Sequence, residues 1–123
     1  MHCQVRSAER VFFDGEATMV VAESPTGEFA IMDGHAPLLA AVGDAPLRVK
    51  TGDGEVTLAC YGGALRVSND GTVSVLVEDA TPIEEIDLEG VRRRLAEIGG
   101  DRPESEGERR RLLVLERTKE RHG

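Results

Sequence analysis

The sequence predicts an antiparallel β domain followed by two α-helices. Short stretches within residues 1–86 alternate apolar with polar side chains or are rich in β-branched residues, which is typical of strands with one buried face. Turn sequences such as Asp33-Gly34 separate these stretches, and no helical pattern lies between them. After Pro82 the apolar period changes from two residues to about 3.6, the period of a helix.

The strand predictions cover most of the first part of the chain. The clearest stretches are residues 18–23, 47–50, 55–60, 64–68 and 72–77. Residues 27–39 add a short apolar strand, a glycine turn and a second strand that Pro37 introduces. Strands spaced this closely favour antiparallel sheets that either pack face to face or close into a barrel.

Two cysteines and a pair of glycines lie in or beside these strands. By alternation Cys3 and Cys60 share their faces with apolar neighbours, so we expect both as free thiols in the core. Gly62 and Gly63 are not followed by the Lys-Ser/Thr pair of a phosphate-binding loop. We expect these glycines to let two backbones approach closely or to form a bulge.

The C-terminal part predicts a helical hairpin, and we divide the chain into a β domain of residues 1–86 and a helical domain of residues 87–123. Asp87 is placed to cap the first helix. The apolar residues at helical spacing are Leu88, Val91, Leu95 and Ile98. Gly99-Gly100 ends this helix, and Ser105-x-x-Glu108 matches a capping box at the start of the second. Two helices joined by a short loop form an antiparallel pair.

The second helix has four consecutive apolar residues, Leu112 to Leu115. At about 100° per residue they cover most of the helix circumference, and one neighbouring element cannot bury them all. Either the helix is wedged between the first helix and the β domain, or it uses different faces in two conformations.

The charge is divided unevenly along the chain. Residues 1–86 carry 5 basic and 14 acidic side chains, a net −9, and residues 87–123 carry 10 and 9, a net +1. This acidic balance, together with only three Phe, one Tyr and no Trp, argues against nucleic acid as a partner. Residues 109–123 hold six basic and two acidic side chains, so this tail favours an acidic partner surface.

Catalytic and metal-binding patterns are missing from the sequence. The serines lie in no G-x-S-x-G elbow, and neither cysteine has a sequence neighbour that would activate it. His2, His35 and His122 lie far apart in the sequence, without a ligand at metal-binding spacing. We therefore expect no catalytic residue, metal or cofactor. His35 either closes its turn with a hydrogen bond or belongs to a contact surface on that loop.

Membrane insertion and export are not indicated by the sequence. No apolar run approaches the roughly 18 residues that a membrane-spanning helix needs. Arg6, Glu9 and Arg10 stand where a secretory signal would have its apolar stretch. We expect a soluble, cytoplasmic chain.

Four segments stand out when they are taken together. They are Ser7-Ala8-Glu9, the segment G-E-F-A-I-M-D-G-H-A-P-L-L at residues 27–39, Gly62-Gly63-Ala64-Leu65-Arg66-Val67, and Val75-Leu76-Val77-Glu78-Asp79-Ala80. Their order and spacing resemble the epsilon subunit of bacterial F-type ATP synthase across nearly the whole chain. The pattern G-E-x-x-I-x-x-G-H-A-P-L-L is specific for that family.

The resemblance implies a β-sandwich of about ten strands in two antiparallel sheets, followed by an antiparallel two-helix domain. It implies a non-catalytic subunit of the rotating central stalk that joins the gamma subunit to the c-ring and couples proton flow to ATP synthesis. The subunit would be peripheral to the cytoplasmic face of a bacterial plasma membrane. Its helices would fold down on the sandwich or extend upward into the catalytic head, which the alpha and beta subunits form, and inhibit ATP hydrolysis. Two docking states would explain the apolar block of the second helix.

The resemblance also implies roles for single residues. It places Glu28 at the c-ring, and Ser7, His35 and Ala40 along the face toward gamma. The basic residues that would meet acidic segments of the beta subunits are Arg109, Arg110, Arg111, Arg117, Lys119 and Arg121. A solvated helix face is the alternative interpretation for any one of them.

One feature of the family is broken in this sequence. Members whose helical domain binds ATP carry I/L-D-x-x-R-A at the start of the first helix, and here Gly90 replaces the arginine after Asp87. The loss removes a phosphate-directed charge, and Arg92 or its neighbours could replace it only if the helix were rotated. We therefore do not expect ATP binding. The competing functions are a small ATP-sensing regulatory domain outside the complex and a small hydrolase.

Overall fold

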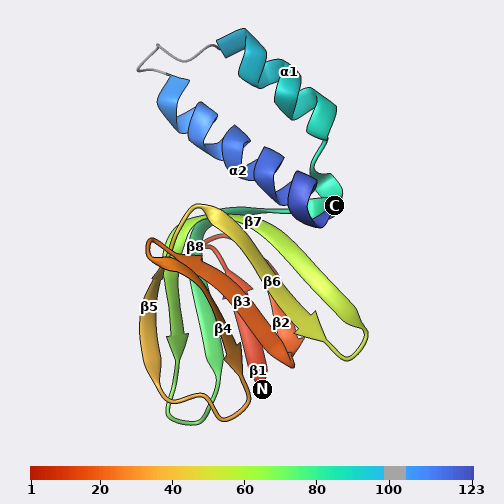
Figure 1. Ribbon diagram of the computed structural model, residues 1–123. Coiled ribbons are helices and arrows are strands. Elements are labelled where there is room, and N and C mark those ends of the chain that lie inside the picture. Colours follow the sequence, from red (N-terminus) through yellow and green to blue (C-terminus); the bar gives the residue numbers. More distant parts are fainter. Residues whose placement is uncertain (99–104) are drawn as a thin grey trace.

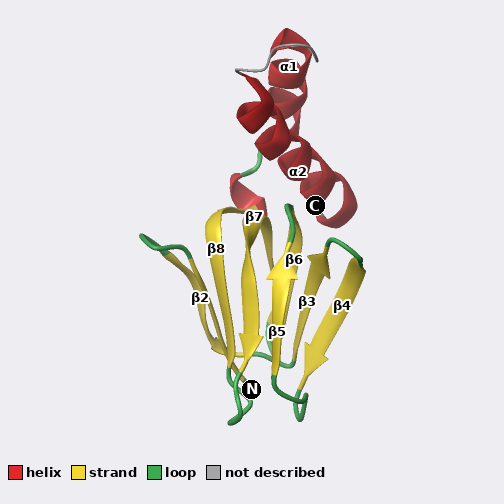
Figure 2. Cartoon of the chain, turned by 90° about the vertical axis from the view of Figure 1, so that its left-hand side faces the viewer, coloured by secondary structure: helices red, strands yellow, loops and turns green. Residues whose placement is uncertain are grey.

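The computed structural model describes residues 1–98 and 105–123, and it confirms a β domain followed by two helices (Figure 1). The strands are β1 (His2–Arg6), β2 (Val11–Glu16), β3 (Met19–Ser24), β4 (Gly27–Met32), β5 (Leu38–Val42), β6 (Ala45–Thr51), β7 (Gly54–Val67) and β8 (Val73–Pro82). A short 3₁₀ turn, η1 (Ile83–Glu85), leads to α1 (Leu88–Ile98) and α2 (Glu106–His122). Both helices lie at one end of the β domain (Figure 2).

The strands form a β-sandwich that is continuous in its hydrogen bonding. Their order is β2-β1-β8-β7-β6-β3-β4, with β5 paired to β7, and every pair is antiparallel except β1 with β8. Strand β7 pairs with β6 through residues 54–60 and with β5 through residues 63–67. One strand therefore serves where two were expected, which is one reason why eight strands are observed and not about ten.

A close approach of two backbones at Gly62 and Gly63 lets β7 bend between its two partners. Both glycines have positive φ, 46° and 157°. A Cβ added to Gly63 would lie 2.1 Å from the carbonyl oxygen of Leu76 and 2.8 Å from Cα of Val77. No side chain fits there, so the expectation of a close approach is confirmed.

The core lies between the layers and is almost entirely aliphatic. Its fully buried side chains include Cys3, Val5, Val20, Ile31, Leu47, Val49, Leu58, Cys60, Leu65, Val73 and Val75. Both cysteines are free and buried, as expected, and burial raises the pKa of each thiol to about 12. Neither thiol is therefore a reactive thiolate at neutral pH.

The helices pack on the sandwich through a second, smaller core. Ala59 and Tyr61 of β7 contribute to it from below, and Ile86, Val91 and Val114 contribute from the helical side. Charged pairs join the two helices to each other, with Arg92 of α1 lying 3.3 Å from Glu116 and 2.9 Å from Glu120 of α2. The expected antiparallel helix pair is present (Figure 1).

The capping box predicted for the second helix is wrong. Ser105 has helical backbone angles, φ −99° and ψ −1°, and its side chain makes no hydrogen bond within the cap. Glu108 instead accepts a 3.1 Å hydrogen bond from Arg94 of α1, which holds the pKa of the Glu108 carboxyl below its usual range. A contact with α1 has replaced the local motif. The expected stop at Gly99-Gly100 lies outside the described residues.

Asp87 begins α1 through its backbone. Its carbonyl oxygen accepts the first helical hydrogen bond from the Val91 N–H at 2.9 Å. Its carboxylate leans over Gly90, where an added Cβ would lie 2.5 Å from Oδ2. The residue thus occupies the N-cap position that the sequence predicts for it.

We expect Gly63→Ala to lower the free energy of unfolding by about 3 kcal/mol, because the methyl group would overlap the β8 backbone at a strained φ. Urea unfolding followed by circular dichroism measures this loss. Gly52→Ala is the matched control, since nothing lies within 4 Å of an added Cβ there. A Gly63→Ala chain as stable as the control would contradict the close approach.

Candidate functional site

An apolar strip on the outside of the sandwich is the first candidate contact surface. It consists of Leu39 and Ala41 on β5, Ala64 on β7 and Leu76 on β8, and we call it the outer strip. Register pairs Ala41 with Ala64 and Ala64 with Leu76, so the strip crosses three neighbouring strands. Leu39 is 74% exposed and Leu76 is 56% exposed. Apolar side chains gathered on a rigid sheet mark an interaction surface.

The outer strip follows from the alternation of its strands. In β8, Val73, Val75 and Val77 are buried, whereas Leu76 stands in the outward phase that polar residues usually occupy. In β5, Leu39 and Ala41 point outward in the same way. Leu76 was not predicted as a contact residue from the sequence. A leucine in the polar phase of a strand was the signal that could have identified it.

The three residues expected to face gamma lie in different settings. Ser7 is buried, and its Oγ accepts hydrogen bonds from the backbone N–H groups of Glu9 at 3.3 Å and Arg10 at 3.1 Å. Ala40 is half-buried and pairs with the buried Leu65, so it lies in the inward phase of β5. Ser7 is next to Ala8, which lines a shallow pocket with Ala64 and Leu76.

His35 is exposed on the β4–β5 loop. Its backbone N–H donates to the Met32 carbonyl at 3.1 Å, and its Nδ1 lies 2.6 Å from the Ala36 carbonyl oxygen. The turn-closing interpretation of this residue is therefore confirmed. Its contact with gamma stays a prediction.

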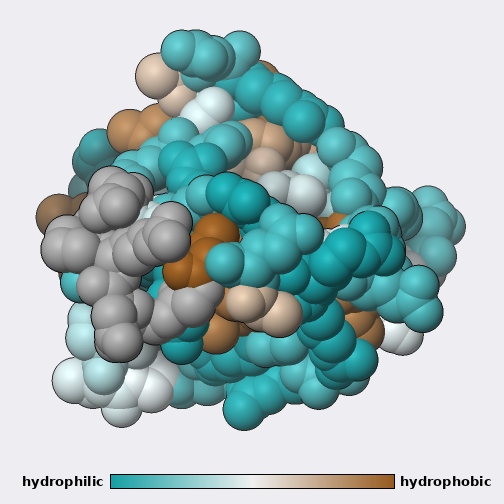
Figure 3. All heavy atoms as spheres, turned by 90° about the horizontal axis from the view of Figure 1, so that it is seen from above, coloured by the Kyte–Doolittle hydropathy of each residue, from teal (hydrophilic) through white to brown (hydrophobic). Residues whose placement is uncertain are grey.

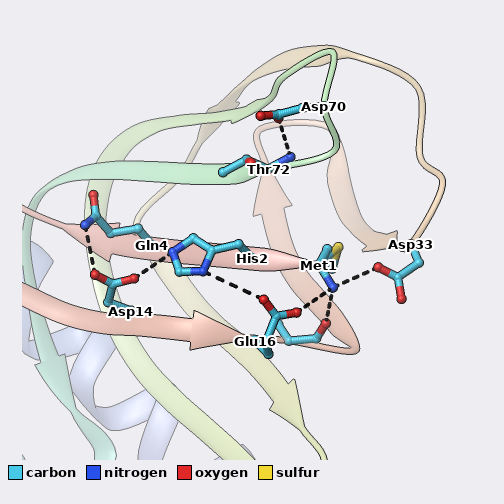
Figure 4. A network of polar contacts seen from close by, with 9 residues as sticks. Met1, His2, Gln4, Asp14, Glu16, Asp33, Asp70 and Thr72 are labelled. Atoms are coloured by element: carbon cyan, nitrogen blue, oxygen red, sulfur yellow. Dashed lines mark hydrogen bonds and ion pairs between the residues drawn. The ribbon is translucent and has the colours of Figure 1, made fainter.

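A network of polar contacts holds this loop at the end of the sandwich away from the helices (Figure 4). The Met1 amino group lies 2.8 Å from Asp33 and 3.3 Å from Glu16, and these carboxylates hold its pKa above the usual value. His2 Nε2 lies 2.7 Å from Asp14. The carboxylates of this end are thus paired within the chain, which ties β1 and β2 to the loop that carries His35.

Glu28 lies at the opposite end of β4 from His35. It is exposed, faces Glu23 across the β3–β4 hairpin, and has its Oε2 3.8 Å from Arg48. Glu23 in turn pairs with Arg117 of α2, which places this hairpin on the helical side of the sandwich. The fold therefore does not bring Glu28 and His35 together, and any partners of the two residues occupy different ends of the subunit.

The basic residues of α2 meet acidic residues of the sandwich. Arg110 lies 2.8 Å from Asp44 and 3.2 Å from Glu78, and Arg111 lies 3.1 Å from Asp79. The acidic partner surface expected from the charge of this tail is, in this conformation, the chain's own sandwich.

The remaining basic residues of the tail differ in their settings. Arg117 pairs with Glu23, and Lys119 donates to the carbonyl oxygen of Ile83 at 3.3 Å. Arg109 is half-buried, and Arg121 is exposed. The roles of all these side chains toward another subunit stay predictions.

The apolar block of α2 is wedged between α1 and the sandwich, as one of the two interpretations expected. Val114 is buried at 5% exposure, and Leu112 and Leu115 are half-buried in the same cluster. Leu113 remains 42% exposed. The helical end is otherwise largely hydrophilic when it is viewed from above (Figure 3).

Asp87 and Gly90 lie beside a small pocket between η1, α1 and α2. The pocket measures about 290 Å³ and has Ile86, Leu112 and Leu115 in its wall, near the lower limit of roughly 300 Å³ for small-molecule sites. Arg92 is engaged by Glu116 and Glu120 of α2. The residues that line this pocket offer a phosphate group a carboxylate and apolar side chains, and no cationic side chain is among them.

Two further kinds of site are absent from the described part of the chain. Residues 1–98 and 105–123 contain no cluster of three His, Cys, Asp or Glu side chains that could hold a metal ion. None of their helices has both the length and the apolar composition needed to cross a bilayer.

A sandwich with an exposed apolar strip and a charged helical hairpin defines a protein that acts through contacts with other chains. The comparisons agree with this class. The family described as "ATP synthase, Delta/Epsilon chain, beta-sandwich domain" matches residues 1–83. The chain belongs to the ATP synthase delta/epsilon chain family, as a non-catalytic epsilon-type subunit, and the expected resemblance is confirmed.

Similar proteins named ATP synthase epsilon chain come from several bacteria. The chain is 34% identical to that of Streptomyces avermitilis over 108 residues, which cover 88% of this chain and 83% of the relative. It is 42% identical to that of Brevibacillus brevis over 90 residues, 72% and 67% of the two chains. It is 31% identical to that of Leptospira borgpetersenii over 121 residues, 98% and 91%.

Two solved structures share the fold. A chain in the mitochondrial ATP synthase of Euglena gracilis, solved with OSCP, F1 and the c-ring, matches with a TM-score of 0.79 at 19% identity, over 97% of this chain and 78% of that one. A chain in the central stalk and c-ring of the Tetrahymena thermophila enzyme matches with a TM-score of 0.67 at 16% identity, over 98% and 94%. At these identities the likeness concerns the fold alone.

We expect Thr118→Val to raise the free energy of unfolding by about 1 kcal/mol. Thr118 is fully buried on α2, and its Oγ1 has no hydrogen-bond partner among the described residues. A methyl group of the same shape removes the desolvation cost of that hydroxyl. Thermal and urea unfolding measure the gain. Thr118→Ser keeps the hydroxyl and should gain nothing, and a Val variant less stable than the wild type would contradict the prediction.

Proposed function

We propose that this subunit works in the rotor stalk by docking its outer strip on the gamma subunit, with Glu28 toward the c-ring. The observation that carries the proposal is the exposure of Leu39 on β5 and Leu76 on β8, the two strands that flank β7. Such side chains are the kind that a partner buries in the centre of an interface. The subunit would thereby couple the c-ring and gamma to proton-driven ATP synthesis at the cytoplasmic face of a bacterial plasma membrane, as a peripheral protein.

The outer strip is tested by binding to purified gamma. We expect Leu39→Glu with Leu76→Glu to weaken binding by at least tenfold, because two buried apolar contacts become unpaired charges. Met32→Glu is the matched control, since Met32 is also exposed and apolar but lies on β4, outside the strip. Co-purification and titration calorimetry measure the affinity. If the double variant binds gamma as tightly as the control, the strip is not the gamma surface.

We further propose that the helical domain restrains ATP hydrolysis by reaching the alpha and beta subunits of the catalytic head. The support is the concentration of six basic residues in the last fifteen, together with Leu113, which this conformation leaves exposed. A cationic helix with an apolar side chain to spare suits an acidic surface with an apolar recess.

Deleting residues 87–123 should preserve assembly with gamma and raise the hydrolysis rate of the assembled enzyme. The expected rise reflects loss of the restraint. It should be larger at low ionic strength, because attraction between charges reaches about 10 Å at 0.1 M salt and a shorter distance at higher salt. Steady-state hydrolysis by reconstituted enzyme measures it, with the full-length chain as the control. Equal rates with and without residues 87–123 would leave only the coupling role.

The alternative of an ATP-sensing domain has less support from the residues. We expect no binding at micromolar ATP by calorimetry, because Gly90 supplies no cation and Arg92 is held by two glutamates. Gly90→Arg would have to displace the Asp87 carboxylate, which a flexible side chain allows. A gain of affinity in that variant would show that the missing arginine is the main defect. Tight binding by the unmodified chain would overturn this prediction.

A further inference from the structure

The contact between α2 and the sandwich includes several ion pairs beside its small apolar cluster. Arg110 bridges Asp44 and Glu78, Arg111 reaches Asp79, and Arg117 reaches Glu23. These carboxylates come from β3, β8 and the turn between β5 and β6, so the helix is held from three places on the sandwich. We call these four pairs the arginine clasp.

Apolar burial in the same contact is confined to a small cluster. Val114 and Thr118 are the buried side chains of α2, and the hydroxyl of Thr118 has no partner among residues 1–98 and 105–123. Leu113 lies beside Arg110 and Arg117 at the edge of the contact and stays 42% exposed. The docked helix therefore depends on charge more than the sandwich core does.

We propose that the arginine clasp is a salt-sensitive, intramolecular lock that keeps the basic face of α2 from other acidic surfaces. The proposal rests on the proposed function in one respect, namely that the released arginines then bind the catalytic head. Exposed pairs of this kind are individually weak, so together they shift the docking equilibrium by roughly tenfold. Screening shortens their reach from about 30 Å at 0.01 M salt to about 3 Å at 1 M.

The lock implies competition between two acidic surfaces for one set of guanidinium groups. In the docked helix the guanidinium groups of Arg110 and Arg111 lie 2.8 and 3.1 Å from Asp44 and Asp79, so α2 must leave the sandwich before both can turn fully to another subunit. Removing the sandwich carboxylates should therefore strengthen inhibition, whereas removing the arginines should weaken it. If α2 had no acidic partner on the sandwich, only removal of the arginines would change the inhibition.

Tyr61 provides a direct probe of docking. It is the only tyrosine of a chain that has no tryptophan, so tyrosine fluorescence reports on this one position. Its side chain is 2% exposed, lies in the helical-end cluster, and is covered by the Arg111 guanidinium 4.6 Å from the ring centroid. Burial also raises the pKa of its phenol. Lifting α2 would uncover the ring.

The test is quenching of Tyr61 fluorescence by acrylamide, a neutral quencher, in the full-length chain. We expect the quenching constant to rise severalfold between about 0.01 M and 1 M NaCl. Arg110→Gln with Arg117→Gln should quench strongly even at low salt, because it removes three of the four pairs and leaves Arg111 over the ring. Arg93→Gln with Arg121→Gln is the matched control, with the same charge change at exposed positions. It should behave as the wild type does.

A second variant tests the lock in the opposite direction. Thr118→Val removes the unpartnered hydroxyl from the docked contact and should lower quenching at every salt concentration. The lock is overturned if wild-type quenching is independent of salt, or if the control variant quenches as strongly as Arg110→Gln with Arg117→Gln.

The hydrolysis measurement separates the lock from the restraint. In the assembled enzyme, Asp44→Asn with Glu78→Gln should lower the hydrolysis rate below that of the wild type, because Arg110 is released to the head. An unchanged rate in an enzyme that does respond to deletion of residues 87–123 would overturn the competition. An enzyme that does not respond to the deletion lacks the restraint itself, and the Tyr61 measurement then decides on the lock alone.

Discussion

The pairing of β7 with β8 is the interaction on which the other features depend. β7 also pairs with β6 and with β5 on either side of its bend, so one ladder joins the layers of the sandwich. Because strand side chains alternate, the ladder sends Leu65 and Val75 into the core and Leu76 outward. Beyond Gly63 the same two strands present Tyr61 and Asp79 to α2. The core, the outer strip and the docking site of the helix are thus three consequences of one register.

Much of this fold could be predicted because its strands alternate and its helices keep a 3.6-residue period. Strands β3, β4, β6 and β8 and both helices lie close to the expected residues. β2 was not predicted, because Val11-Phe12-Phe13 does not alternate and the strand pairs only with β1. The capping box failed for a different reason. A local motif at Ser105 competed with a charged contact to Arg94 that only the folded hairpin provides.

The candidate surfaces could be predicted less completely than the fold. The basic tail was evident from composition, but its acidic partners were not, because Glu23, Asp44 and Asp79 are far apart in the sequence and meet only through the sheet. Similarly, the motif that identifies the family runs through Glu28 and His35, which the fold places at opposite ends of β4. A sequence motif can identify a family without being one surface. The outer strip instead required knowledge of which strands are neighbours.

The small apolar contact beneath α2 limits how firmly the helical domain is attached to the sandwich. Fully burying one Leu or Val side chain contributes about 1.5–3 kcal/mol, so a complete apolar stripe would fix the helix on the sandwich. Here Val114 is the buried apolar residue of α2, and Leu113 is left out. Leu112 and Leu115 share their cluster with Leu95 of α1, so much of the apolar surface of α2 serves to hold the two helices together. The two helices therefore share more apolar surface with each other than α2 shares with the sandwich, and the ion pairs to Glu23, Asp44, Glu78 and Asp79 complete the attachment of the hairpin.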